Sequence, residues 1–293
     1  MVADMTRLEK NSQLFWVLYD LRSAYEDGDF TEFVKFLAED CVYESMWVLE
    51  SLRGRDAVAN HLLNKGAAIC ESASYPSGRI VELVGNMNPV SDTELVVNGE
   101  KKNGSVALMY EPGKYCLMME QELDGKINQT LVDLKLDSEG KVSRIDLCMP
   151  ELFRTKAMYD WINLRFAKKD EEHESDEVLV GKTYLTELYL FFGLAGVYFD
   201  EYADQYIPLE KWDKMLGFWK KFVDATDYDA IYEQFAGVDY NAWTVADKNA
   251  NRRLRQNGDR LWKERKNNAV MLADLMEWTE RYRGEYDGIQ FEW

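Results

Sequence analysis

Acidic residues stand in the middle of several predicted β-strands, where a carboxyl group could do chemistry: Glu44, Glu120, Asp133 and Asp146. Asp133 lies between Val132 and Leu134, and a carboxyl group that is desolvated by apolar neighbours acquires a raised pKa suited to general acid or base catalysis. Asp133, Asp146 and Glu44 are therefore our candidate catalytic residues. Side chains alternate along a strand, so each acid could equally lie on a solvated outward face, and both interpretations stay open.

The sequence offers little support for other kinds of site. It contains two histidines, His61 and His173, and neither has a second histidine four residues away, so no zinc motif is present. We expect His61 to be a partly buried structural residue and His173 to be solvated. The glycine-rich motifs of nucleotide-binding proteins are absent, and the four cysteines form no C-x-x-C pair. We therefore expect no metal, no cofactor and no cysteine nucleophile.

The elements that must position the candidate acids begin with predicted helices. Residues 6–27 carry apolar side chains at helical spacing, and Gly28 ends this helix. A second, short helix is expected to follow, with Asp29 as its cap and Glu32 in the position from which a carboxylate reaches back to the cap. The apolar residues of the first helix predict the side that packs on the core: Leu8, Phe15, Leu18 and Tyr25.

The stretch of residues 41–69 organises the rest of the N-terminal half. Residues 41–47 alternate in character as a strand does, residues 48–52 form a second extended piece, and residues 57–69 return to helical spacing. Further extended segments alternate with turn sequences at 79–84, 94–97, 106–110, 115–123, 127–136 and 142–149. Consecutive strands joined by tight turns predict an antiparallel sheet.

This order of elements resembles the SnoaL-like branch of the nuclear transport factor 2-like superfamily. The residues that carry the likeness are YEDGDF at 25–30, CVYES at 41–45 and LRGRDAV at 52–58. The resemblance covers roughly residues 5–150, about half of the chain. It implies a strongly curved sheet wrapped around helices to form a cone, with a pocket at the open end. Enzymes similar to this fold, such as ketosteroid isomerases and polyketide cyclases, place an Asp or a His in that pocket.

Aromatic residues would line the concave wall of the implied cone. Their rings and hydroxyl groups suit a flat apolar ligand, and Arg53 could anchor an acidic one. Packing of the core explains the same aromatic residues equally well, and an arginine near a turn is commonly solvated. The candidate ligand-binding residues are Trp16, Tyr19, Tyr43, Trp47, Arg53 and Tyr115.

The C-terminal half has a different character. We expect a trailing helix at 152–168, and then an acidic linker at 169–177 that separates two domains. Residues 178–293 lack clear strand patterns and predict an all-helical domain, in which Pro208 begins one helix. The expected fold class is α+β: a cone-shaped, curved antiparallel sheet packed on helices at residues 1–168, followed by an all-α C-terminal domain.

The net charge of the chain is −18 over 293 residues, so its surface repels phosphate backbones and nucleic acid is not an expected partner. The longest apolar run contains Glu187 and is too short to span a membrane, and no signal peptide is evident at the start of the sequence. We therefore expect a cytoplasmic protein without a membrane partner.

Two functional hypotheses fit these observations. The first is a SnoaL-like pocket protein that binds a small apolar or aromatic molecule, with catalysis left open. The alternative is a non-catalytic protein that binds another protein through its acidic surface, such as a regulatory or immunity protein. A homodimer formed through the open sheet face is also compatible with the sequence.

Overall fold

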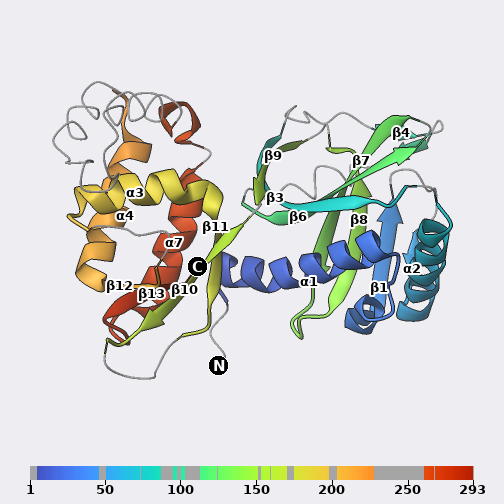
Figure 1. The fold of residues 1–293 in the computed structure, drawn as a ribbon, viewed down its shortest axis with the longest axis horizontal. Coiled ribbons are helices and arrows are strands. Elements are labelled where there is room, and N and C mark those ends of the chain that lie inside the picture. The colour runs from blue at the N-terminus through green and yellow to red at the C-terminus, as the bar shows by residue number, and fades with distance from the viewer. Residues whose placement is uncertain are drawn as a thin grey trace. The chain divides into compact units, whose positions relative to one another are not determined.

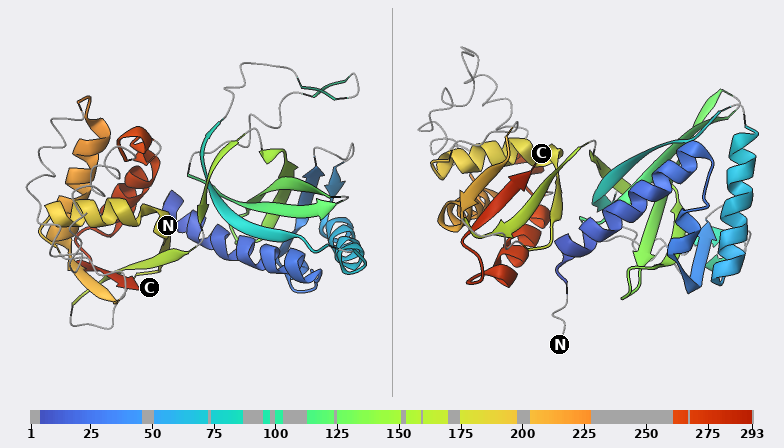
Figure 2. Two further views of the ribbon diagram at one scale, coloured as in Figure 1. Left: turned by 45° about the horizontal axis from the view of Figure 1, so that its top comes forward. Right: turned by 60° about the horizontal axis from the view of Figure 1, so that its bottom comes forward.

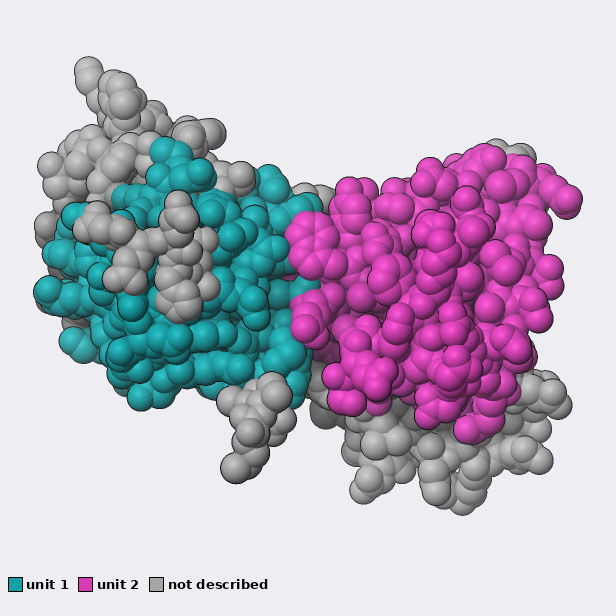
Figure 3. Space-filling model, turned by 90° about the horizontal axis from the view of Figure 1, so that it is seen from below, with its two compact units in different colours: residues 1–12, 159–293 teal, residues 13–158 magenta. Residues whose placement is uncertain are grey.

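The computed structural model describes residues 5–45, 51–72, 74–86, 95–97, 100–102, 113–123, 125–150, 153–158, 160–169, 175–197, 203–227, 261–266 and 268–292. The chain divides into two compact units (Figure 3). Unit 2 is residues 13–158, and unit 1 combines residues 1–12 with residues 159–293. The division therefore falls before the expected linker at 169–177, and the first residues of the chain belong to the C-terminal unit.

Unit 2 is built on a curved sheet of seven strands that does not close on itself (Figure 2). The order is β2-β1-β8-β7-β6-β3-β9, and the strands are β1 Leu37–Ser45, β2 Leu52–Arg53, β3 Ser77–Asn86, β6 Tyr115–Leu123, β7 Lys126–Leu136, β8 Val142–Cys148 and β9 Phe153–Met158. Two short strands, β4 Leu95–Val97 and β5 Glu100–Lys102, pair with each other. The predicted antiparallel order holds for the described pairs of the large sheet except β1 and β8, which run parallel.

Two long helices pack on one face of this sheet (Figure 1). They are α1 Arg7–Asp27, which confirms the helix predicted at 6–27, and α2 Arg55–Cys70. Phe15 of α1 contacts the ring of Tyr115, and His61 of α2 contacts the ring of Tyr43. We call the face of the sheet that carries Tyr43 and Tyr115 the inner face, and the opposite face the outer face.

The end of α1 lies against α2, and glycines make this approach possible. Gly28 has a φ of 69°, and a Cβ atom there would lie 2.7 Å from the Sγ of Cys70. A Cβ atom at Gly66 would collide with the carbonyl oxygen of Gly28. Beyond Gly28, where a short capped helix was predicted, the chain forms a short 3₁₀ helix, η1 Phe33–Phe36. Asp29 accepts a hydrogen bond from the Thr31 amide two residues on, as a capping residue does, but Glu32 directly precedes η1 and makes no side-chain capping bond.

Unit 1 contains a second sheet, so the expectation of an all-α C-terminal domain is wrong. Its order is β11-β10-β13-β12, all antiparallel, with β10 Trp161–Ala167, β11 Val178–Gly181, β12 Gln205–Pro208 and β13 Gly288–Glu292. The described helices of this unit are η3 Lys182–Tyr184, α3 Leu185–Leu194, α4 Leu209–Asp224 and α7 Ala269–Tyr282. The helix predicted to start at Pro208 is confirmed as α4.

The helix predicted at 152–168 is also wrong, because β9 and β10 occupy this segment. Along β10, Ile162, Leu164 and Phe166 are buried, and the residues between them are only partly buried, so the period is two. The expected linker joins β10 to β11 within one sheet, with Ser175 bonded to the backbone of Phe166. Residues 170–174, and with them His173, lie outside the described residues.

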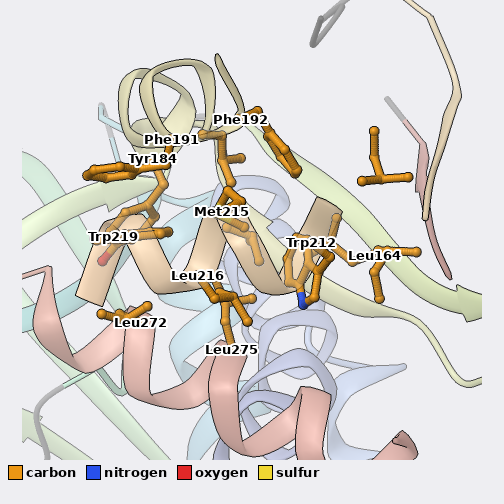
Figure 4. Packing of buried hydrophobic residues seen from close by; sticks show 14 of the residues in the cluster. Leu164, Tyr184, Phe191, Phe192, Trp212, Met215, Leu216, Trp219, Leu272 and Leu275 are labelled. Atoms are coloured by element: carbon orange, nitrogen blue, oxygen red, sulfur yellow. The ribbon is translucent and has the colours of Figure 1, made fainter. Parts of the chain in front are cut away.

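The core of unit 1 is rich in aromatic side chains, which come from its sheet and from the described helices α3, α4 and α7. Figure 4 shows aromatic residues of α3 and α4 packed together with leucines of α7. Phe191 of α3 stacks on Trp219 of α4 with ring centroids 5.5 Å apart. The indole Nε1 of Trp212 donates a hydrogen bond of 2.7 Å to the hydroxyl of Thr279 on α7. Burial of these large rings stabilises the unit.

The first turn of α1 is part of unit 1. Glu9 is buried and accepts hydrogen bonds from the Thr6 amide at 2.6 Å and from the Tyr282 hydroxyl at 2.7 Å. Arg281 lies 3.2 Å from the same carboxylate. The Ser12 hydroxyl accepts a hydrogen bond from the backbone N–H of Leu179 on β11. These contacts attach the start of the chain to elements from its far end.

Candidate functional site

The register of unit 2 separates the candidate residues onto the two faces of the sheet. Glu44 of β1 stands opposite Asp146 of β8, and Asp146 stands opposite Asp133 of β7. The neighbouring positions on the same strands, Tyr43, Ile145 and Leu134, are paired in the same way. Because successive side chains of a strand point to opposite faces, the three acids lie on the outer face and Tyr43 lies on the inner one.

The acids on the outer face are linked by basic side chains, and we call Glu44, Asp146, Asp133, Cys116, Arg144 and Lys114 the outer row. Arg144 forms ion pairs with Glu44 and with Asp146, the latter with an Nε–Oδ2 distance of 2.7 Å. The side chains of Glu44 and Arg144 are about a third exposed, whereas Asp146 is buried. Both contacts are charge-assisted hydrogen bonds, which are stronger than neutral ones.

Asp133 is the most deeply buried acid of the outer row, with 2% of its side chain exposed. Its Oδ1 lies 2.5 Å from the Nζ of Lys114 and 3.8 Å from the Sγ of Cys116. Its Oδ2 is buried and accepts no hydrogen bond from the part of the chain that the structure describes. Burial raises the pKa of Asp133, the Lys114 ammonium opposes this rise, and the Asp146 carboxylate adds to it.

The cysteines near Asp133 are not activated as nucleophiles. Burial raises the pKa of the Cys116 thiol well above its ordinary value, and the Asp133 carboxylate raises it further. Burial also raises the pKa of the Cys148 thiol. Both thiols are therefore protonated near neutral pH, which is unfavourable for nucleophilic attack by either of them.

The inner face carries an acid that the sequence reasoning missed, Glu82 of β3. It is 1% exposed and stands opposite Tyr115 of β6 on one side and Lys156 of β9 on the other. Glu82 lies between Val81 and Leu83, which is the same pattern that singled out Asp133. The signal was therefore present in the sequence, but the face of the sheet could not be read from it.

Two of the predicted aromatic residues lie buried on the inner face. Tyr115 is buried against Phe15, and burial raises the pKa of Tyr43 to about 12. The ring centroids of Tyr43 and His61 are 4.6 Å apart, and burial followed by the Lys65 charge lowers the pKa of His61. His61 is partly buried, as expected for a structural residue, and it is neutral near pH 7.

The other predicted ligand-binding residues are not gathered with Tyr43 and Tyr115. Trp16 of α1 is 41% exposed, and Tyr19 is partly buried beside it with the ring centroids 6.1 Å apart. Arg53 is an exposed residue of the edge strand β2. Trp47 lies outside the described residues. The structure therefore brings the three acids together on the outer face and places two of the tyrosines on the inner face. It does not bring these acids and aromatic residues into one site.

Two further observations bear on ligands and location. Among the described residues, no group of three or more His, Cys, Asp or Glu side chains is placed to hold a metal ion. Within the same residues, no helix combines the length and the apolar character needed to cross a membrane.

Comparison of the chain with known proteins gives no relative from which a role could be transferred. No protein-family model matches the sequence, and no curated protein matches it. The geometry of unit 2 therefore carries the functional interpretation.

Proposed function

We propose that unit 2 is a small-molecule-binding domain of the SnoaL-like kind, and that its ligand is an apolar or aromatic molecule held between the inner face of the sheet and the helices. Two features support this proposal. The sheet is curved and open, and α1 and α2 pack on one of its faces, which agrees with what the resemblance implies. The inner face is lined mainly by apolar and aromatic side chains, which such ligands require.

The observation that carries the proposal is the position of Glu82. It is a buried carboxyl group on a mainly apolar face, directly opposite Tyr115 and Lys156 in the register. A small number of polar groups on an apolar surface fixes the orientation of a bound molecule. The preferred ligand would therefore be a flat apolar molecule with a hydroxyl or amino group that donates a hydrogen bond to Glu82.

The same geometry changes the proposed catalytic residue. Asp133, Asp146 and Glu44 face away from Tyr43 and Tyr115, and two of these acids are held by Arg144 in ion pairs. We therefore assign the acid/base role to Glu82 instead. Proton transfer to or from its carboxyl group is the chemistry that this residue would supply to a bound substrate.

Native mass spectrometry of the protein purified from its own source tests the proposal. We expect a co-purified molecule of small mass, and we expect the Glu82→Gln variant to bind it about 10- to 100-fold more weakly, because a hydrogen bond to a charged group contributes about 1.5–3 kcal/mol. Glu44→Gln is the matched control, since it makes the same chemical change on the outer face. Its affinity should equal that of the wild type.

Two results would reject this function. One is a ligand whose affinity falls in Glu44→Gln but not in Glu82→Gln, because this would place the ligand on the outer face. The other is recovery of a specific protein partner without a small molecule, which would favour the alternative role of an acidic interaction protein with a net charge of −18.

A further inference from the structure

The outer row contains more negative than positive charge. Three carboxylates, Glu44, Asp146 and Asp133, share two cations, Arg144 and Lys114. Lys135 of β7 is a further basic group that acts on Asp133, but it stands opposite Arg144 and is partly exposed, so solvent weakens its effect. The buried thiols of Cys116 and Cys148 are neutral and balance none of this charge.

The excess charge is concentrated at the buried end of the row. Arg144 neutralises the partly exposed end, where Glu44 lies, and also contacts Asp146. Asp133 has one oxygen paired with Lys114, while its buried Oδ2 lacks a donor from the described residues. Asp146 stands directly opposite across the β7–β8 pair, and two neighbouring carboxylates disfavour simultaneous ionisation.

We propose that Asp133 is a proton-binding site of unit 2, and that proton uptake there couples the stability of β7 and β8 to pH. One proton would neutralise the excess charge of the outer row and convert the unpartnered Oδ2 into a hydroxyl group. The acceptor for that hydroxyl would be the facing carboxylate of Asp146, as in other pairs of carboxyl groups that share a proton.

The direction of the pH effect follows from linkage. Burial raises the pKa of Asp133 in the folded protein above its value in the unfolded chain. Between the two pKa values the folded state therefore binds more protons, and stability falls as the pH rises through this window. If the ion pair with Lys114 dominated instead, it would lower the pKa of Asp133, and stability would rise with pH.

Hydrogen exchange of the full chain tests the proposal, with mass-spectrometric detection of peptides from β7 and β8. The measured quantity is the protection of the wild type divided by that of Asp133→Asn, because intrinsic exchange rates cancel at each pH. As the pH rises above about 4, the ordinary value for an aspartate, we expect this ratio to fall, by up to about tenfold for each pH unit, until Asp133 is deprotonated in the folded protein. A ratio that is constant or that rises with pH would overturn the proposal.

Asp40→Asn is the control, because it removes an exposed carboxylate from β1 in the same unit. The ratio of wild-type to Asp40→Asn protection should not change over the same pH range. If Asp133→Asn does not fold, Lys114→Gln supplies a second test: loss of the opposing ammonium should move the pH dependence of β7 protection to higher pH. An unchanged pH dependence in that variant would refute the role of Asp133.

Discussion

Replacement of Glu9 by Ala should destabilise unit 1 by about 2–4 kcal/mol, although Glu9 lies at the opposite end of the sequence from most of that unit. Glu9 and Thr6 form a capping box, in which the Thr6 amide donates to Glu9 and the Glu9 amide donates to the Thr6 hydroxyl. Loss of the cap costs about 1 kcal/mol. The Tyr282 hydroxyl and the Arg281 guanidinium also lose their shared acceptor, which adds about 1–3 kcal/mol.

Urea unfolding followed by tryptophan fluorescence suits this measurement, because five tryptophans among the described residues belong to unit 1: Trp161, Trp212, Trp219, Trp262 and Trp278. A double-mutant cycle with Tyr282→Phe should give a coupling energy of about 0.5–3 kcal/mol between Glu9 and Tyr282. A loss below about 0.5 kcal/mol in Glu9→Ala, or a loss confined to exchange protection in unit 2, would refute the attachment of the first turn to unit 1.

Further predictions concern close packing in each unit. Gly66→Ala should destabilise unit 2 by at least about 2 kcal/mol, because the added Cβ would collide with the Gly28 carbonyl. Gly217→Ala on α4 should instead stabilise unit 1 by about 0.5–1 kcal/mol, because a Cβ there would have no neighbouring atom within 4 Å. Equal effects of the two substitutions on urea midpoints would contradict this packing. Trp212→Phe should cost about 2–4 kcal/mol, because it leaves the Thr279 hydroxyl without the indole donor and opens space in the aromatic core. If this variant loses only about 1 kcal/mol of unfolding free energy, as an average substitution does, then the core repacks around the smaller ring.

Local signals in the sequence predicted much of unit 2. The helix ending at Gly28 and the hairpins around Gly125 and Gly140 depend on residues close together in the chain, and these glycines have φ values of 69°, 71° and 75°. The parallel pairing of β1 with β8 joins segments about a hundred residues apart, so no local pattern indicates it. The segment 106–110, predicted as a strand, lies outside the described residues.

The C-terminal unit was harder to predict because its strands are defined by distant partners. Trp161, Ile162 and Arg165 fit a helical spacing as well as a strand, and only pairing with β11 and with β13 decides between them. Glu82 was missed as a candidate for the same reason. Its sequence context equals that of Asp133, and the two acids differ only in the face to which the register assigns them.

Unit 1 combines segments from the two ends of the chain, and this sets the order in which the two units can fold during synthesis. Strand β10 lies between β11 and β13, so its second edge stays open until residues 288–292 leave the ribosome. Glu9, in the first turn of α1, can accept its hydrogen bond from Tyr282 only after that residue has also emerged. The described strands of unit 2 are complete once residue 158 has emerged. A nascent chain stalled near residue 280 would therefore contain every described strand of unit 2, whereas the sheet of unit 1 would still lack β13.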